Sequence, residues 1–416
     1  MHPPAPRSAL ARFFAANVLF GSGLFAHGFL YNFYLAELRA GPAAMGAAAA
    51  ALTAGGLAAL APAGVLVDRA GPRRAYLLAA VTAAAGLMAG SFAESLTGLY
   101  AAAFVAGAGT AAWRVAMGPA TLALASGPTQ ARAFSWNVGL LLASGAVWTW
   151  GAGAVPALLG GGMPGVRAAL AIGAVGTLLG GALFATVPLP AREDASPSTE
   201  AGARPRARSL AESLAVPAPV LVRVGLVALW MTAAALVIPF FNLYFQRAQG
   251  LPIARIGGLL AAAQAVSAVA VFASGSLAAR LGPARVLLGW VLLFGPAVWG
   301  MAAVAALGPA VALYMVQGFA APATHPLVDQ LLLRDAPEDR RGAVSSWRNA
   351  ATEGSGLAGA ALGGVLLERT SFAVLFGVAG TLGLAAGGAL AATFLLRPRP
   401  SAHAPAPAPA APVEAA

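Results

Sequence analysis

Six ionisable side chains lie inside long apolar segments of this sequence, where they could transfer protons or form ion pairs. They are His27, Arg114, His325, Asp329, Arg348 and Glu353. A charged residue at the centre of a bilayer costs about 2.5–3.5 kcal/mol, so each of them needs a physical reason. A carboxyl or an imidazole in such a place can take up and release a proton, or it can pair with an opposite charge.

Glu353 is the sharpest candidate for proton uptake. It lies about three helical turns into an apolar segment, within Ala351-Thr352-Glu353-Gly354-Ser355-Gly356. The alternative is structural: Glu353 pairs with Arg348 or forms a hydrogen bond with Asn349, five and four residues earlier. The two interpretations carry equal weight.

His325 and Asp329 are one helical turn apart and share a helix face. Asp329 stands near the end of its segment, so we favour a solvated or gate-bracing acid there, with proton coupling as the other hypothesis. His325 is a candidate for proton coupling, and Arg114 occupies the equivalent position in the repeat described below. Together they would make a basic cavity suited to an anionic or polar substrate, unless Arg114 pairs with Glu353 or Asp329.

Polar and aromatic residues near the first apolar segment are candidates for ligand contact. His27, Tyr31 and Tyr34 recur at helical spacing, with Asn32 beside them. Such groups can orient a ligand while aromatic rings cover its apolar part. We favour a functional role for His27 and a structural one for Asn32 and Asn242. The cavity candidates are Tyr31, Asn32, Arg114, Asn242, Gln264 and Gln317.

The composition determines which elements must carry these residues. The chain has 416 residues, of which 59% are hydrophobic and 9% charged, and its mean hydropathy is +0.78. A soluble domain has about 25% charged residues, and one membrane span needs ~20 apolar residues. The sequence therefore predicts an all-α membrane protein with roughly a dozen spans.

The charges argue against several other classes of protein. The net charge is +11, but the basic residues are all arginines, most of them between or at the ends of apolar segments, which does not suit nucleic-acid binding. There is no cysteine, and the four histidines lack metal-ligand spacing. We find no phosphate-binding glycine loop and no Ser-His-Asp set. We therefore expect neither an enzyme nor a bound metal or cofactor.

Loop-forming Gly-Pro and Ala-Pro pairs divide the apolar sequence into two sets of six expected spans. The first set is 11–37, 43–67, 75–96, 98–125, 131–158 and 166–189, and the second is 218–246, 253–279, 284–307, 309–333, 343–368 and 371–396. We expect domains at 1–189 and 218–396, a flexible linker at 190–217 and a disordered tail at 397–416. Glu37, Arg223 and Glu368 stand at segment ends and are expected to reach water.

The arginines set an expected orientation. Most of them fall on the same side as the N-terminus, and only Arg39, Arg167, Arg247, Arg255 and Arg369 fall on the other side. Because cytoplasmic loops carry the excess of arginine, both termini and the linker are predicted to be cytoplasmic.

The two sets of spans are copies of each other. Gly275 to Arg285 matches Gly64 to Arg74 at an offset of 211 residues, in Gly, Leu, Arg, Gly, Pro and Arg positions. The same offset aligns Ser135-Trp136 with Ser346-Trp347, and an offset of 210 aligns Asn32 with Asn242. The sequence therefore predicts two parallel six-helix repeats.

The stretch Gly64-Val65-Leu66-Val67-Asp68-Arg69-Ala70-Gly71-Pro72-Arg73-Arg74 resembles the signature loop between the second and third spans of major facilitator superfamily transporters. The resemblance covers about residues 10–396. It implies two six-helix bundles that rock around a site at mid-membrane, lined by the first, fourth, seventh and tenth spans. Asp68 has no counterpart acid, since Ala279 stands in the second repeat. The resemblance implies that Asp68 braces the first half against Ser345, Ser346 and Arg348 when the cytoplasmic side is closed.

The residues that this resemblance singles out as a cytoplasmic gate are Gly64, Asp68, Arg69, Gly71, Arg73 and Arg74. It implies a monomeric secondary transporter in the cell membrane, with the lipid bilayer, a small molecule and protons as partners. The apolar cavity helices favour efflux of an amphipathic or hydrophobic molecule in exchange for protons. The alternative is a proton symporter or facilitator that imports a small metabolite, and Arg114 and His325 would suit an anionic one. The fifth span lacks the Gly-Pro-x-x-Gly-Gly element of the family's antiporters, which argues against antiport. A further alternative is a protein of this fold that serves as a receptor or scaffold and does not transport.

Overall fold

The computed structural model describes residues 7–125, 128–189, 216–337 and 340–396. The predicted tail 397–416 and all of the predicted linker except 216–217 lie outside these ranges. In the first half the helices are α1 (Arg7–Glu37), α2 (Pro42–Phe92), α3 (Leu96–Leu124), α4 (Pro128–Leu158) and α5 (Gly162–Ala185). In the second half they are α7 (Ala218–Val237), η1 (Ile238–Phe240), α8 (Phe241–Arg247), α9 (Ile253–Leu281), α10 (Pro283–Ala303), α11 (Leu307–Arg334), α12 (Arg341–Arg369) and α13 (Phe372–Leu395).

The helix α2 contains two spans that meet at a sharp bend. Gly71 has φ 80° and ψ 162°, a conformation open to glycine because it has no Cβ. Its repeat counterpart Gly282, between α9 and α10, has φ 86° and ψ 141°. Both halves therefore make the predicted turn with the same glycine. The predicted spans 43–67 and 75–96 are the two arms of α2.

The remaining predicted spans match single helices to within a few residues, apart from one interruption. The seventh span is broken by the 3₁₀ turn η1, which contains Pro239 and separates α7 from α8. Counting the arms of α2 separately, and α7, η1 and α8 as one, gives twelve spans in the described ranges. This confirms the predicted all-α fold.

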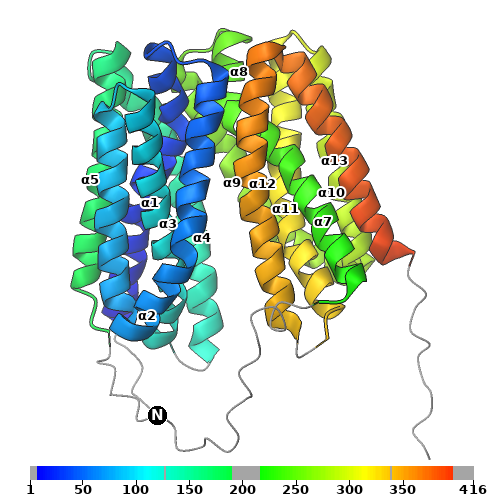
Figure 1. Cartoon of the computed structure of the whole chain (residues 1–416), viewed down its shortest axis with the longest axis horizontal. Coiled ribbons are helices and arrows are strands. Elements are labelled where there is room, and N and C mark those ends of the chain that lie inside the picture. Colours follow the sequence, from blue (N-terminus) through cyan, green and yellow to red (C-terminus); the bar gives the residue numbers. More distant parts are fainter. Residues whose placement is uncertain (1–6, 126–127, 190–215, 338–339, 397–416) are drawn as a thin grey trace, which may run out of the picture.

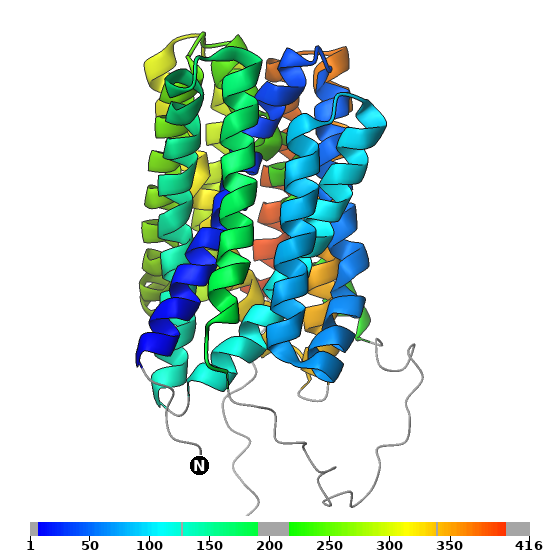
Figure 2. The ribbon, with the colours of Figure 1, turned by 90° about the vertical axis from the view of Figure 1, so that its left-hand side faces the viewer.

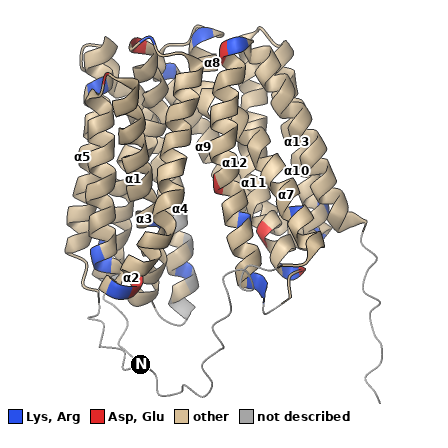
Figure 3. Ribbon diagram, viewed as in Figure 1, with Lys and Arg blue, Asp and Glu red and all other residues tan. Residues whose placement is uncertain are grey.

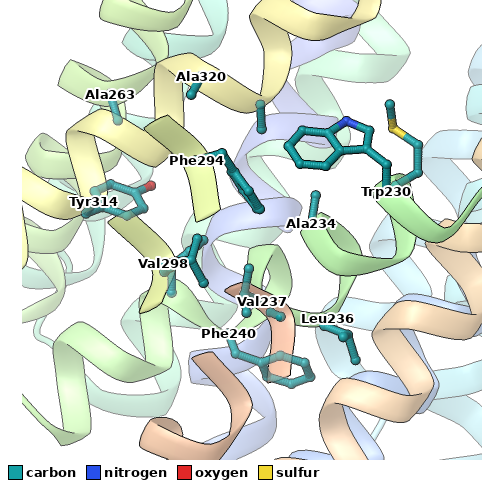
Figure 4. Close-up of a cluster of buried hydrophobic side chains, with 14 of the residues drawn as sticks. Trp230, Ala234, Leu236, Val237, Phe240, Ala263, Phe294, Val298, Tyr314 and Ala320 are labelled. Atoms are coloured by element: carbon teal, nitrogen blue, oxygen red, sulfur yellow. The ribbon is translucent and has the colours of Figure 1, made fainter. Parts of the chain in front are cut away.

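The helices α1–α5 pack as one bundle and α7–α13 as a second beside it, with their long axes roughly parallel (Figures 1 and 2). In the first bundle Phe20 stacks on Trp113 at 4.3 Å between ring centroids, and Tyr76 stacks on Phe184 at 3.7 Å. In the second, Trp230 meets Phe294 edge-to-face at 4.9 Å, in a cluster that also includes Val298 and Phe240 (Figure 4). Each bundle thus has aromatic packing of its own.

Figure 3 shows that charged residues gather at the two ends of the bundles. A smaller group lies within the second bundle, in its lower half in this view. We call the end that carries the α2 bend at Gly71 and the start of α1 the basic end. The other is the opposite end. It carries the loops that follow α1 and α8.

Two repeat-related arginines hold the last helix of each bundle at the basic end. Arg12 donates to the carbonyl of Thr186 at 2.9 Å, after α5, and Arg223 donates to the carbonyl of Thr393 at 3.2 Å, in α13. Cations are favourable near helix C-termini, where carbonyls lack partners. Arg223 is only 5% exposed and pairs with Asp335 at 2.8 Å, so the prediction that it reaches water was wrong.

Candidate functional site

A cavity of about 630 Å³ lies between the two bundles. Residues of α1, α2 and α3 form its wall on one side, and residues of α7, η1, α8, α9, α11 and α12 form the other. The predicted first, fourth, seventh and tenth spans all contribute, and so do the second, eighth and eleventh. Most of the wall is apolar, from residues such as Leu24, Met45, Leu52, Met231 and Leu260.

His27 and Tyr31 form an aromatic pair in the wall of the first bundle. Their rings stack at 4.0 Å between centroids, and His27 is only 5% exposed. The Tyr31 hydroxyl donates to the carbonyl of Leu99 at 3.2 Å. The Nε2 atom of His27 has no hydrogen-bond partner among the described residues, and it lies beside Gly90, whose missing side chain leaves room there. Buried polar groups nearly always have a partner, so this nitrogen is available to a ligand or a water molecule.

The second bundle brings Tyr314, Gln317 and His325 to the cavity from α11, and Gln264 from α9. Gln264 donates to the hydroxyl of Thr149 in the first bundle at 2.9 Å. Tyr314 was not among the predicted site residues. Its only signal was a position one turn before Gln317, and an aromatic residue in an apolar helix more often serves packing.

The two asparagines that the repeat aligns bond to each other across the bundles. The Asn32 amide donates to the Asn242 side-chain oxygen at 3.2 Å and to the carbonyl of Pro239. The Asn242 amide donates in turn to the carbonyl of Phe29 at 2.9 Å. Asn32 lines the cavity at this contact, whereas Asn242 lies behind it. These bonds close the cavity towards the opposite end.

Glycines complete this closure at two symmetric places. A Cβ on Gly364 of α12 would lie 3.0 Å from the Cα of Gly46 in α2, and one on Gly153 of α4 would lie 2.9 Å from the Cα of Gly257 in α9. The offset of 211 residues converts Gly46 into Gly257 and Gly153 into Gly364. Both helix pairs therefore approach backbone to backbone at equivalent points.

Glu368 adds a hydrogen bond to the first of these helix pairs. It accepts from the Ala43 amide at 2.7 Å, at the first turn of α2, where helix amides lack partners. Glu368 is also exposed, as predicted, so it reaches water while it makes this contact.

The cavity is open towards the basic end. Figure 1 shows the bundles closest at the opposite end and further apart towards the basic end. There Ser345, Ser346 and Asn349 of α12 are exposed.

Two ion pairs lie on the basic-end side of the cavity. Arg114 of α3 pairs with Glu353 of α12 at 3.3 Å, and this pair joins the two bundles. Arg348 pairs with Asp329 at 2.7 Å within the second bundle, beside a smaller cavity of about 150 Å³. Of the alternatives for Glu353, the structure has the pair with Arg114 and not the one with Arg348. Arg114 is thus paired with a carboxylate, and it is not among the residues of the cavity wall.

The signature loop contributes to the first bundle itself. Arg73 donates to the carbonyl of Ala185 at the C-terminus of α5. Gly71 makes the bend described above, and Asp68 precedes it by three residues, next to Arg69. Gly64 has open space beside it, and Arg74 is exposed at the bend. Within the described ranges no three His, Asp or Glu side chains are grouped to hold a metal ion.

Two pseudo-symmetric helical bundles around a central cavity are the architecture of an alternating-access membrane transporter. The Major Facilitator Superfamily model matches residues 13–314 and 227–416. The chain belongs to the Major Facilitator Superfamily.

Solved structures agree with this assignment at the level of the fold. A variant of the nucleoside transporter NupG superimposes with a TM-score of 0.76 at 12% identity, covering 93% of this chain and 100% of that one. A bacterial homologue of the human lysosomal transporter Spinster, inward-facing and occupied, gives 0.73 at 16% identity over 95% and 97% of the two chains. An inward-facing bacterial homologue of the iron transporter ferroportin gives 0.69 at 15% identity over 92% and 98%. No curated protein sequence matches the chain.

Proposed function

We propose that this transporter exports a small amphipathic or hydrophobic molecule through the cell membrane in exchange for protons. The observation that carries the proposal is the cavity of about 630 Å³ between the bundles, apolar in most of its wall and closed at one end. A predominantly apolar wall with a few polar groups suits a ligand that is itself mostly apolar. Sugars and peptides would leave their polar groups without partners in such a wall.

The arginine distribution supports a cytoplasmic basic end, with both termini in the cytoplasm. In that orientation the cavity is open to the cytoplasm and can take up a molecule from there or from the inner leaflet. Rocking of the bundles would then separate the Gly46–Gly364 and Gly153–Gly257 contacts and bring the basic ends together.

The Arg114–Glu353 pair supports proton coupling. It joins the bundles at 3.3 Å, and the Glu353 side chain is 22% exposed, so water can deliver a proton to it from the basic end. Protonation removes the negative charge and with it the attraction to Arg114. Protonation of Glu353 thereby changes the free energy of the conformation in which the Arg114–Glu353 pair joins the two bundles. Glu353 is the residue that couples the proton in this proposal.

Import of a small anionic metabolite by symport or facilitated diffusion is the second candidate function. The Arg114 side chain is 49% exposed, and a proton on Glu353 would leave its charge without the carboxylate. An anion could then pair with Arg114.

Proteoliposomes with an imposed pH gradient test these proposals. Movement of cationic, neutral and anionic fluorescent amphipathic dyes is measured with the wild type and with Glu353→Gln, against protein-free liposomes. We expect gradient-dependent movement in the wild type and a loss of at least about tenfold in Glu353→Gln. Glu94→Gln is the matched control, because Glu94 pairs with Arg167 at 2.6 Å on the surface of the first bundle and is 70% exposed.

Dye movement that ignores the gradient in the wild type would reject proton exchange and leave a facilitator. Gradient-driven movement that survives in Glu353→Gln would reject the role of this carboxyl. Movement of anionic dyes alone would favour the second candidate function.

A further inference from the structure

We propose that the molecule bound in the cavity has a hydrogen-bond-donating polar end, a protonated amine attached to an apolar body. This inference rests on the proposed function, in which the cavity binds the transported molecule. It follows from the hydrogen-bond donors and acceptors of the cavity wall that remain available to a ligand.

Four serine and threonine hydroxyls line the cavity, from α2, α3, α9 and α12. Three donate their one proton to a backbone carbonyl of their own helix: Thr53 to Ala49 at 3.1 Å, Thr110 to Ala106 at 2.8 Å and Thr352 to Arg348 at 3.1 Å. Ser267 lies within hydrogen-bonding distance of two carbonyls, of Ala263 in α9 at 2.7 Å and of Gly318 in α11 at 2.5 Å. A hydroxyl has one donor and two acceptor lone pairs. Towards the cavity these four groups can therefore only accept.

Three further polar groups of the wall also use donors within the protein. The Tyr31 hydroxyl donates to Leu99 at 3.2 Å, and the Asn32 amide donates to two oxygens of the second bundle. The Gln264 amide donates to Thr149 at 2.9 Å, which leaves one of its two hydrogens. Acceptors again outnumber donors in what these groups offer a ligand.

The other four polar groups of the wall do not change this balance between hydrogen-bond donors and acceptors. His27, Tyr314, Gln317 and His325 form no hydrogen bond with any described residue, and each can both donate and accept. No carboxylate or guanidinium belongs to the wall within the described ranges. The nearby Glu353 and Asp329 are occupied by Arg114 and Arg348. The wall as a whole thus offers an excess of acceptors.

An excess of acceptors discriminates between ligand charges. An anion brings only acceptors, so the six wall groups that can only accept would stay without partners beside it. Its oxygens could be served only by the remaining donors, those of Gln264, His27, Tyr314, Gln317 and His325. An ammonium group brings up to three donors and no acceptor. The rings of Tyr31, Phe241 and Tyr314 also face the cavity, with Phe241 and Tyr314 at 4.9 Å between centroids, and a cation is attracted to aromatic faces.

Three probes with the same diphenylpropyl body separate donor capacity from charge. They are 3,3-diphenylpropylammonium, its N,N,N-trimethyl analogue, which has the charge but no N–H, and 3,3-diphenylpropanoate. Binding is measured by titration calorimetry at pH 7 on the protein in lipid nanodiscs, with empty nanodiscs subtracted. We expect the primary ammonium to bind about tenfold or more tightly than the trimethyl analogue, and the carboxylate to bind least. Equal or tighter binding of either comparison probe, or no binding of any of the three, overturns the proposal.

A double substitution tests the wall directly. Thr53→Val with Thr110→Val removes two acceptors and keeps the shape of the side chains, so we expect about a fivefold or greater loss for the ammonium and no change for the trimethyl analogue. Thr232→Val is the control, because Thr232 donates to Ala228 at 2.8 Å in the same way but lies outside the cavity wall. Unchanged ammonium affinity in the double variant overturns the proposal.

The two proposals fail in different ways. Ammonium that binds with the expected preference but is not carried into proteoliposomes, beyond the rate in protein-free liposomes, would reject export and keep the ligand class. Transport of the ammonium and trimethyl probes at equal affinity would reject the ligand class and keep transport.

Discussion

Arg223 and Asp335 show how a residue at a helix end can serve the fold. The guanidinium bonds Asp335 and a carbonyl of α13, and it lies over the ring of Phe394 at 4.6 Å. The two side chains are 6% and 16% exposed. In such surroundings, loss of one partner leaves the other charge without compensation, which costs more than the intact pair contributes.

Asp335→Asn should therefore lower the free energy of unfolding by about 3 kcal/mol. Thermal unfolding of the protein in nanodiscs measures the effect. Glu94→Gln is the comparison, because its exposed pair with Arg167 contributes at most about 1 kcal/mol. Equal stability of the two variants would contradict the buried role of Arg223.

Single residues differ in how far the sequence predicted their positions. Glu353 was identified because a carboxyl in an apolar helix is costly wherever the helix packs. Its partner Arg114 stayed one of several alternatives, because sequence spacing relates residues within one helix and these two belong to different bundles. The contact of the exposed Glu368 was not predicted for the same reason: Ala43, whose amide it binds, is 325 residues away in the chain.

At the scale of elements, the opposite end of the molecule is closed by helices that touch at glycines. The pairs α2–α12 and α4–α9 are equivalent by the repeat, and in both of them an added Cβ would meet the backbone of the neighbouring helix. Close approach of this kind requires small residues, as in other membrane helix contacts. A larger side chain at one of these glycines should separate the bundles at that end.

Gly364→Val should therefore increase the population that is open at the opposite end. The chain has no cysteine, so spin labels on Glu37→Cys and Ala248→Cys report the separation of the bundles without background. We expect the distance distribution to shift to longer values in Gly364→Val. Gly354→Val in the same helix is the control, since a Cβ there meets nothing within 4 Å. Unchanged distances in Gly364→Val would show that these glycines do not set the closure.

Helix positions were predicted well because Gly-Pro and Ala-Pro pairs interrupt apolar segments of spanning length. The bend at Gly71 and its copy at Gly282 follow from residue types alone. The break at η1 was not predicted, since Pro239 stands among apolar residues that otherwise continue the helix. The glycine contacts were not predicted either, because the sequence contains 51 glycines and many of them have open space around them.

At the scale of the whole molecule, the closure at the opposite end is symmetric and the acidic residues are not. Asn32 with Asn242, and the two glycine pairs, obey the repeat. Glu353 stands opposite Leu142 in the repeat, Asp329 opposite Gly118, and Asp68 opposite Ala279. The symmetric residues let the two bundles meet, and the acids without a counterpart in the other repeat are where the two bundles differ.

For Asp68 we propose a role in the other conformation. When the basic ends approach each other, the α2 bend comes nearer to the start of α12, where Ser345 and Ser346 are exposed in the present conformation. Helix amides and a hydroxyl at that N-terminus favour a carboxylate. Arg348, now paired with Asp329 at 2.7 Å, lies about two turns into the same helix. Asp68 would thus stabilise the conformation that is closed at the basic end.

Asp68→Asn should leave expression and ligand affinity unchanged and slow turnover by about tenfold, since each cycle passes through the closed conformation. A charge-assisted hydrogen bond of about 1.5 kcal/mol corresponds to that factor. Turnover in proteoliposomes is the measurement, and Ala279→Asn, at the exposed equivalent position, is the control that should have no effect. A turnover rate equal to that of the wild type would mean that this carboxylate does not stabilise the closed state, and that the loop acts through its bend and its arginines alone.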